Sequence, residues 1–219
     1  MLEQILTELK GSNTKLIAVS KTKPNEAILE LYNQGQLAFG ENYVQELVDK
    51  QATLPTDIEW HFIGHLQSNK VKYIAPFVAM IHAVDSLKLL HEINKQATKN
   101  DRVIKVLLQF HIAEEESKFG FDTEGVKKLA EELSQSTLTN IDICGVMGMA
   151  TFTDDKAQVR REFKELKHIF DNIKNIYFAD SQSFTEISMG MSDDYKMAIE
   201  EGSTMVRIGS LLFGKRNYV

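Results

Sequence analysis

Lys21 is the first residue whose position suggests chemistry, because it directly follows a short apolar run, LIAVS. Such a run is typical of a buried strand. If Ile17 and Val19 face the interior of a barrel, alternation along the strand places the Lys21 ammonium at the top of that interior. A buried lysine amine with cationic neighbours loses its proton more easily and then forms Schiff bases. The simpler interpretation is a solvated lysine just past a strand end, like Lys23.

Two glycine- and serine-containing segments near the end of the chain are predicted starts of helices. SMGMSDD passes through Gly190 to Ser192, and RIGSLLFG passes through Gly209 to Ser210, with Arg207 beside them. Unpaired amides at a helix start bind phosphate, and glycine lets the phosphate approach the backbone. The alternative is ordinary helix capping, with Arg207 in a surface ion pair.

Polar residues also follow the second and third apolar runs. Glu41 and Asn42 come at a predicted sheet rim, where the simplest role for Asn42 is the N-cap of a helix. His61 and His65 are four residues apart, as two metal ligands on a helix would be. Because Gly64 lies between them and no third ligand is evident, we predict no metal site. His61 is expected to be a hydrogen-bonded histidine of the core or of a pocket.

Several methionines occur near the predicted ends of the last three strands: Met147, Met149, Met189, Met191 and Met205. They are expected to pack in the core, although thioethers also suit a flat aromatic ring. A lysine and a phosphate cradle together predict a pocket for a ligand that carries both an aldehyde and a phosphate. Pyridoxal 5'-phosphate (PLP) is such a ligand. An arginine facing its ring nitrogen would keep that nitrogen unprotonated and weaken the ring as an electron sink.

The elements that would position these residues alternate regularly along the chain. Eight apolar runs are predicted strands, within residues 16–20, 37–42, 58–64, 78–85, 103–110, 141–149, 187–190 and 204–209. Each of the first seven precedes a stretch with helical periodicity, and the last leads into the helix start at RIGSLLFG. An open, doubly wound sheet would show the same alternation. The count of eight favours an α/β fold, a single (β/α)8 TIM barrel domain over residues 1–219, with about 27 residues per unit.

Some helix boundaries are predicted from local signals. A long helix is expected over about residues 156–172, and NIYFAD (175–180) is either an extra strand or the frayed end of that helix. SDDYKMAIEEG is expected to form a helix that is capped by Ser192 at its start and Gly202 at its end.

The composition argues against several classes of protein. The chain has 219 residues, a formal net charge of −6 and one cysteine, Cys144. The charge argues against nucleic-acid binding, and one cysteine allows no internal disulfide. No run reaches the roughly 18–20 apolar residues of a membrane span, and the first residues lack the pattern of a secretory signal. We therefore expect a cytoplasmic protein that binds neither membranes nor nucleic acid. We also expect it to be a monomer.

The chain also resembles the pyridoxal phosphate homeostasis proteins (the YggS/PROSC family) from about Leu16 to Arg216. The motifs that carry the resemblance are AVSKTKP, FGENYVQE, WHFIGHLQSNK, GVMGMA, ISMGMSDD and GSTMVRIGSLLFGKR. The resemblance implies one barrel like the N-terminal domain of alanine racemase. It also implies a set of cofactor-binding residues: Lys21 for the Schiff base, Ser192, Gly209 and Ser210 for the phosphate, Arg207 for the pyridine nitrogen, and Asn42 and Met147 in the lining. The sequence departs from the family pattern in a short amino-terminal helix and around Gly148 and Met149.

The resemblance further implies a role in homeostasis of PLP, a form of vitamin B6, without established catalysis. PLP-dependent apo-enzymes are possible acceptors. The alternative is a PLP-dependent enzyme, such as a weak amino-acid racemase or a lyase. Racemisation needs acid–base groups on both faces of the substrate, and Lys21 supplies one. A Schiff-base aldolase that acts on a phosphorylated sugar would use the same lysine and phosphate cradle.

Overall fold

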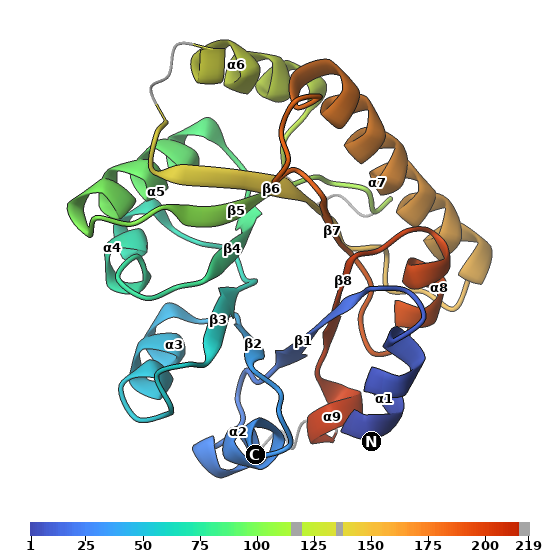
Figure 1. Cartoon of the computed structure of the whole chain (residues 1–219). Helices are drawn as coiled ribbons and strands as arrows, with labels where there is room; N and C mark the ends of the chain where they lie inside the picture. Colours follow the sequence, from blue (N-terminus) through green and yellow to red (C-terminus); the bar gives the residue numbers. More distant parts are fainter. Residues whose placement is uncertain (115–119, 135–137, 215–219) are drawn as a thin grey trace.

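Eight parallel strands close into a barrel in the computed structural model, in the order β1 to β8 around the ring (Figure 1). The structure describes residues 1–114, 120–134 and 138–214. The strands are β1 (Lys15–Val19), β2 (Ala38–Glu41), β3 (Glu59–Phe62), β4 (Met80–Val84), β5 (Ile104–Gln109), β6 (Ile141–Met147), β7 (Glu186–Ser188) and β8 (Met205–Ile208). Because β8 pairs with β1, the sheet has no free edge, and the predicted (β/α)8 TIM barrel is confirmed.

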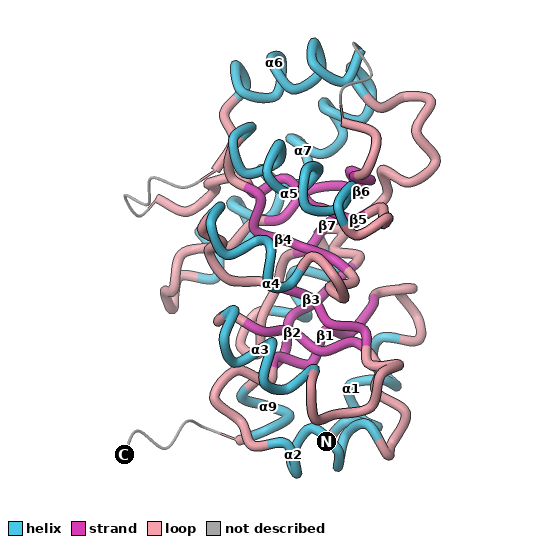
Figure 2. Tube along the Cα trace, turned by 90° about the vertical axis from the view of Figure 1, so that its left-hand side faces the viewer, coloured by secondary structure: helices cyan, strands magenta, loops and turns pink. Residues whose placement is uncertain are grey.

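Helices surround the strands on the outside of the ring, which is seen from the side in Figure 2. They are α1 (Leu2–Leu9), α2 (Asn25–Tyr32), α3 (Val44–Gln51), η1 (Ser68–Lys70), α4 (Val71–Ile74), α5 (Leu87–Lys99), α6 (Thr123–Ser134), α7 (Lys156–Tyr177), α8 (Tyr195–Glu200) and α9 (Ser210–Phe213). Among the residues that the structure describes, no helix is long and apolar enough to cross a membrane.

Alternation along the strands divides the apolar side chains between two cores. Leu16 and Ala18 of β1 join the large core between barrel and helices, whereas Ile17, which is also buried, does not. A second cluster contains strand residues alone and fills the barrel interior: Met80, Ala83, Leu107, Cys144, Met147 and Met205. Ile17 is therefore buried on the inner face of β1, as predicted. The carboxyl end of β1, which precedes Lys21, lies at the top of the barrel.

Two boundaries near the end of the chain differ from the prediction. The helix α7 continues to Tyr177, so the start of NIYFAD is helical. The predicted start of α8 at Ser192 is wrong, because α8 begins at Tyr195 with Asp194 as its N-cap residue. The side chain of Asp194 instead closes a turn by accepting a hydrogen bond from Met191 N at 2.5 Å. The predicted end is confirmed, since Gly202 follows α8 with a φ of +95°.

Candidate functional site

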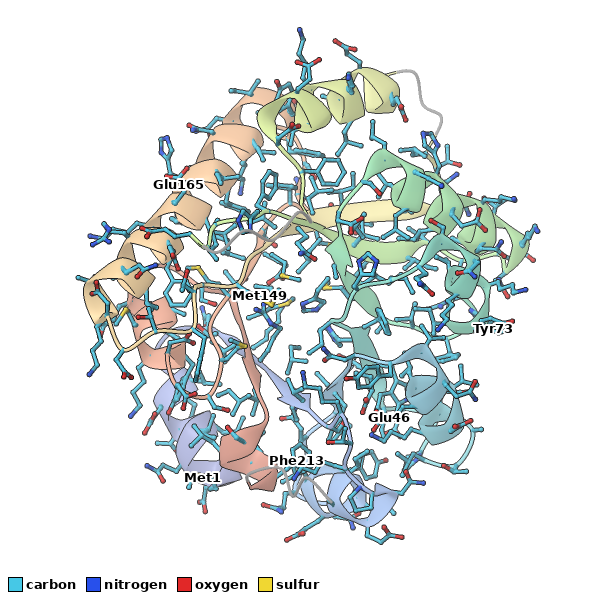
Figure 3. The ribbon with its side chains drawn as sticks, turned by 180° about the vertical axis from the view of Figure 1, so that it is seen from behind. Met1, Glu46, Tyr73, Met149, Glu165 and Phe213 are labelled. Carbon is cyan, nitrogen blue, oxygen red and sulfur yellow. The ribbon has the colours of Figure 1, made fainter. Side chains whose placement is uncertain are left out.

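A pocket of about 230 Å³ lies beyond the carboxyl ends of β1, β2 and β8. It brings together most of the predicted site residues: Lys21, Asn42, Ser192, Arg207, Gly209 and Ser210. Met149, which is labelled in Figure 3, and Met191 also line it. Met147 does not line this pocket, because its side chain packs in the apolar cluster inside the barrel. The site thus lies at the face of the barrel where active sites of this fold occur.

Lys21 is half-buried in a tight turn directly after β1. The turn is closed by a hydrogen bond from Lys23 N to Ser20 O, and Thr22 has a left-handed φ of +63°. Lys23 Nζ donates to Phe213 O at 2.9 Å, which connects the turn to the end of α9. Lys21 therefore lies in a turn with defined contacts, and its neighbour Lys23 serves as a structural link.

Arg207 of β8 is buried, with 4% of its surface exposed, so the alternative of a surface ion pair is wrong. Its Nη1 donates to Ser188 Oγ at 2.6 Å, and its Nη2 donates to Gly148 O at 3.0 Å. Burial lowers the pKa of Arg207 to about 10, and the Asp194 carboxylate opposes that shift. The guanidinium is therefore a fixed, charged donor at neutral pH.

Behind Arg207, hydrogen bonds continue across the barrel interior through Ser188 to two histidines. His82 Nδ1 lies 3.0 Å from Ser188 Oγ, and His82 Nε2 lies 2.9 Å from His61 Nδ1. Arg207 can only donate to Ser188 Oγ, so among the described atoms bonded to this buried hydroxyl, His82 Nδ1 is the one that can accept its hydrogen, and we assign it that role. His82 then donates from Nε2 to His61. Each group is thereby assigned one role in the network.

Burial also keeps both histidines neutral. It lowers the pKa of His61 to about 4, with help from Lys15 and Lys105, and it lowers the pKa of His82 well below the usual value. His61 is thus the hydrogen-bonded histidine of the core that the sequence predicts. His65 lies instead 3.3 Å from Asp85. Within the described ranges, no three His, Cys, Asp or Glu side chains gather as they would around a metal ion.

The predicted phosphate cradle is the start of α9, where Gly209 precedes Ser210. Gly209 N donates to Ser192 Oγ at 3.3 Å, so the two predicted segments meet. A Cβ at Gly209 would lie 3.2 Å from Val19 O, closer than most side chains tolerate. The first amides of a helix have no acceptor within the helix. These groups, with the serine hydroxyls, can donate hydrogen bonds to an anion.

Asn42 lines the pocket with an unsatisfied acceptor. Its Oδ1 is buried and has no hydrogen-bond partner among the residues that the structure describes. The simplest alternative, a helix N-cap, is wrong, because the N-cap residue of α3 is Tyr43. Buried acceptors without partners are rare and costly, so Asn42 Oδ1 is suited to a ligand group that donates a hydrogen bond.

The sequence interpretation missed the residues behind the pocket. His82 and Ser188 stand in apolar runs, and their convergence depends on how β4 and β7 are arranged around the ring. Lys50 and Glu46, which were also not predicted, join Glu41 of the predicted sheet rim in a second network beside Lys21. Two features of the sequence could have indicated these networks. One is His82 inside the apolar run IHAVD, and the other is the oppositely charged pair Glu46 and Lys50, four residues apart on one helix.

A wider groove of about 960 Å³ adjoins the pocket and shares four of its lining residues: Phe152, Met191, Ser192 and Asp193. It runs between α1, α8 and the beginning of α7. Phe152 is 86% exposed at this shared rim. The pocket therefore opens toward solvent on this side.

Comparison with known proteins first gives the class of the barrel. The model of the alanine racemase N-terminal domain family matches residues 2–217. Alanine racemase from Bartonella henselae has a TM-score of 0.70 at 14% identity, which covers 99% of this chain and 59% of that chain and shows the fold alone. The chain belongs, within this class, to the pyridoxal phosphate homeostasis protein family.

Curated relatives of that name span bacteria and humans. The protein from Aquifex aeolicus is 43% identical over 211 residues, which are 95% of this chain and 90% of that protein. The human protein is 37% identical over 96% of this chain and 80% of its own length. The structure of PipY from Synechococcus elongatus PCC7942 with PLP bound has a TM-score of 0.82 at 36% identity, and covers 98% of this chain and all of that chain. The same protein without PLP has a TM-score of 0.87.

Proposed function

We propose that this chain binds PLP as a Schiff base on Lys21 and serves PLP homeostasis without catalysing a reaction of its own. The observation that carries the proposal is the pocket itself. It combines the Lys21 amine, the start of α9 and the buried Arg207 guanidinium in one small volume. The names of the relatives and the PLP bound to PipY support the same function.

The residues of the pocket fit the groups of PLP. The amine of Lys21 can attack an aldehyde carbon, with formation of a C=N bond and release of one water. Ser192, Ser210 and the first amides of α9 offer donors to a phosphate, and the missing Cβ of Gly209 leaves space beside Val19. The unsatisfied Asn42 Oδ1 suits a hydroxyl donor on the ring.

Arg207 supports a role other than catalysis. When bound, PLP supplies an aldehyde and an electron-withdrawing ring. A charged arginine only donates hydrogen bonds, so it cannot accept one from a protonated ring nitrogen. Its positive charge also disfavours protonation of that nitrogen. The ring would therefore be a weak electron sink. The open side of the pocket also suits transfer of PLP to acceptor apo-enzymes, which we propose as partners.

The proposal is tested by the visible absorbance of the full chain during titration with PLP. We expect a yellow Schiff-base band that borohydride removes, and its loss in Lys21→Ala. An exposed lysine at the end of α1 gives the matched control, Lys10→Ala, which is expected to behave as wild type. A wild-type protein that stays colourless with PLP would contradict the proposal and favour a sugar-phosphate aldolase.

The same preparations separate a carrier from an enzyme. We expect no turnover of a panel of amino acids by the PLP-loaded protein. Turnover that disappears in Lys21→Ala would instead assign a racemase or lyase. Asp193 in the pocket lining would then be the first candidate for a second acid–base group.

A further inference from the structure

The two peptide groups on either side of Lys21 are held by charged side chains of α3. The amide that follows Lys21, Thr22 N, donates to Glu46 Oε1 at 2.6 Å. The carbonyl that precedes it, Ser20 O, accepts from Lys50 Nζ at 2.8 Å. Figure 3 labels Glu46, which lies on α3. One helix therefore holds the backbone of the reactive residue on both sides.

The Lys50 ammonium at the centre of this arrangement is almost fully buried and uses all its protons. Besides the Ser20 carbonyl, it donates to Glu41 Oε1 at 2.7 Å and to Glu46 Oε1 at 2.6 Å. An ammonium has three protons, and bonds between charged groups are the strong ones. Ser20 Oγ also donates to Glu41 Oε1, at 2.6 Å. The Lys50 side chain is consequently fixed by three acceptors and has little freedom to move.

The backbone of the turn needs such support. Thr22 has a φ of +63°, a left-handed conformation that is unfavourable for a β-branched residue. The bond from Thr22 N to the Glu46 carboxylate stabilises this conformation directly. On the other side of the turn, Lys23 Nζ donates to the carbonyls of Phe213 and Gly214. The turn is thus fastened to α3 by the two peptide groups that flank Lys21, and to α9 through Lys23.

We propose that Glu46 and Lys50 are positioning residues that hold the Lys21 amine in the orientation needed to form its Schiff base with PLP. The inference rests on the proposed function, because it assigns a role toward that cofactor. Schiff-base formation joins Nζ to the aldehyde carbon and releases the oxygen as water, so its rate depends on where Nζ is held. Neither Glu46 nor Lys50 has a polar atom in the pocket lining around Lys21. Their effect is therefore exerted through the backbone.

The test is the rate of Schiff-base formation with PLP by full-length Glu46→Ala, followed by absorbance. Loss of a hydrogen bond to a charged group corresponds to about a tenfold effect or more, so we expect formation about tenfold slower and the Kd for PLP about tenfold higher. The charge-matched control is Asp49→Ala on the same helix, whose exposed carboxylate accepts, among the described residues, from Gln45 Nε2 alone. We expect this control to stay within about twofold of wild type.

A rescue experiment distinguishes positioning from a general loss of stability. Asparagine adopts the left-handed conformation more readily than threonine does. Thr22→Asn in the Glu46→Ala background is therefore expected to recover most of the lost rate. Thermal unfolding of each variant shows whether it is folded at the assay temperature. If Glu46→Ala is not folded at that temperature, all variants and the wild type are compared at a lower temperature at which it is folded.

A Glu46→Ala protein that forms the Schiff base within about twofold of the wild-type rate would overturn the inference. A tenfold loss that Thr22→Asn does not recover would overturn it as well, because the effect would not pass through the turn. Failure of the proposed function gives a different result, since wild type itself would then show no Schiff-base absorbance. The inference is supported if wild type shows the Schiff-base band, Glu46→Ala forms it about tenfold more slowly, and Thr22→Asn recovers most of the lost rate in that background.

Discussion

His61 and His82 show how burial sets the chemistry of single residues in this barrel. Both rings are buried in the barrel interior, and each is held as a neutral imidazole by that burial. A neutral His82 can accept from Ser188 and donate to His61, whereas a charged ring could only donate. Protonation would therefore disrupt the network behind Arg207.

The stability of the folded state is expected to depend on His61 in acid. The pKa of His61 is about 4 in the folded state and about 6.5 when exposed, so the stabilisation is complete above pH 6.5 and is lost as the pH falls toward 4. The shift corresponds to about 3 kcal/mol. In His61→Gln, urea unfolding at pH 6.5 and pH 4 is expected to show a smaller fall in unfolding free energy than in wild type. The amide oxygen of glutamine can still accept from His82.

The exposed His168 of α7 provides the control for this measurement, because His168→Gln makes the same substitution at the surface. We expect this variant to follow the wild-type pH dependence. Equal pH dependence of His61→Gln and wild type would show that His61 is not the group whose protonation destabilises the fold.

At the scale of elements, a bulge between β5 and β6 shapes the floor of the site. Val106 pairs with Ile143, but the next residue of β5, Leu107, pairs with Gly145, so β6 contains one extra residue. Gly145 has a φ of +151°, and a Cβ there would lie 1.8 Å from Glu186 O of β7. Gly148, just beyond the end of β6, supplies a carbonyl that accepts a hydrogen bond from Arg207.

Gly145→Ala is therefore expected to destabilise the fold strongly. Left-handed strain and the clash with the neighbouring strand together correspond to about 3 kcal/mol or more. The measurement is the free energy of unfolding in urea. Gly11→Ala is the matched control, since nothing lies within 4 Å of its added Cβ, and its effect is expected to stay near about 0.5 kcal/mol. Comparable stabilities of the two variants would contradict the steric account of β6.

The strands could be predicted from sequence because parallel strands buried on both faces form continuous apolar runs. All eight predicted runs overlap observed strands, and the helix-ending Gly202 was also recognisable from its type. The start of α8 was not, because Ser192 uses its hydroxyl to accept from Gly209 N, a residue of another unit. Contacts of this kind depend on closure of the barrel and have no signal within a single segment.

The same limit applies to the site. Lys21, Asn42, Ser192, Arg207, Gly209 and Ser210 all follow or end strands, so the fold class alone places them at one face. Met147 also ends a strand, β6, yet its side chain packs into the barrel. The hydrogen bond from Lys50 to the Ser20 carbonyl could not be predicted, because a lysine on a helix is normally solvated. Only the packing of α3 against the turn at Lys21 shows its role.

At the scale of the whole molecule, closure of the ring brings the first and last units together. Because β1 pairs with β8, the turn that contains Lys21 lies beside α9 and shares a pocket with Gly209 and Ser210, although these residues are almost the whole chain apart in sequence. The contact of Lys23 with Phe213, labelled in Figure 3, joins the same two segments. A lysine and an anion site therefore become one pocket only in the closed barrel.

Lys21 is proposed to carry the cofactor, and the position of a reduced adduct on the chain tests this proposal. The protein is loaded with PLP, reduced with borohydride, digested and analysed by mass spectrometry. The account predicts a pyridoxyl group on Lys21 and none on Lys23, whose Nζ donates to the carbonyls of Phe213 and Gly214. Modification of a different lysine, or an even distribution over exposed lysines, would contradict the account.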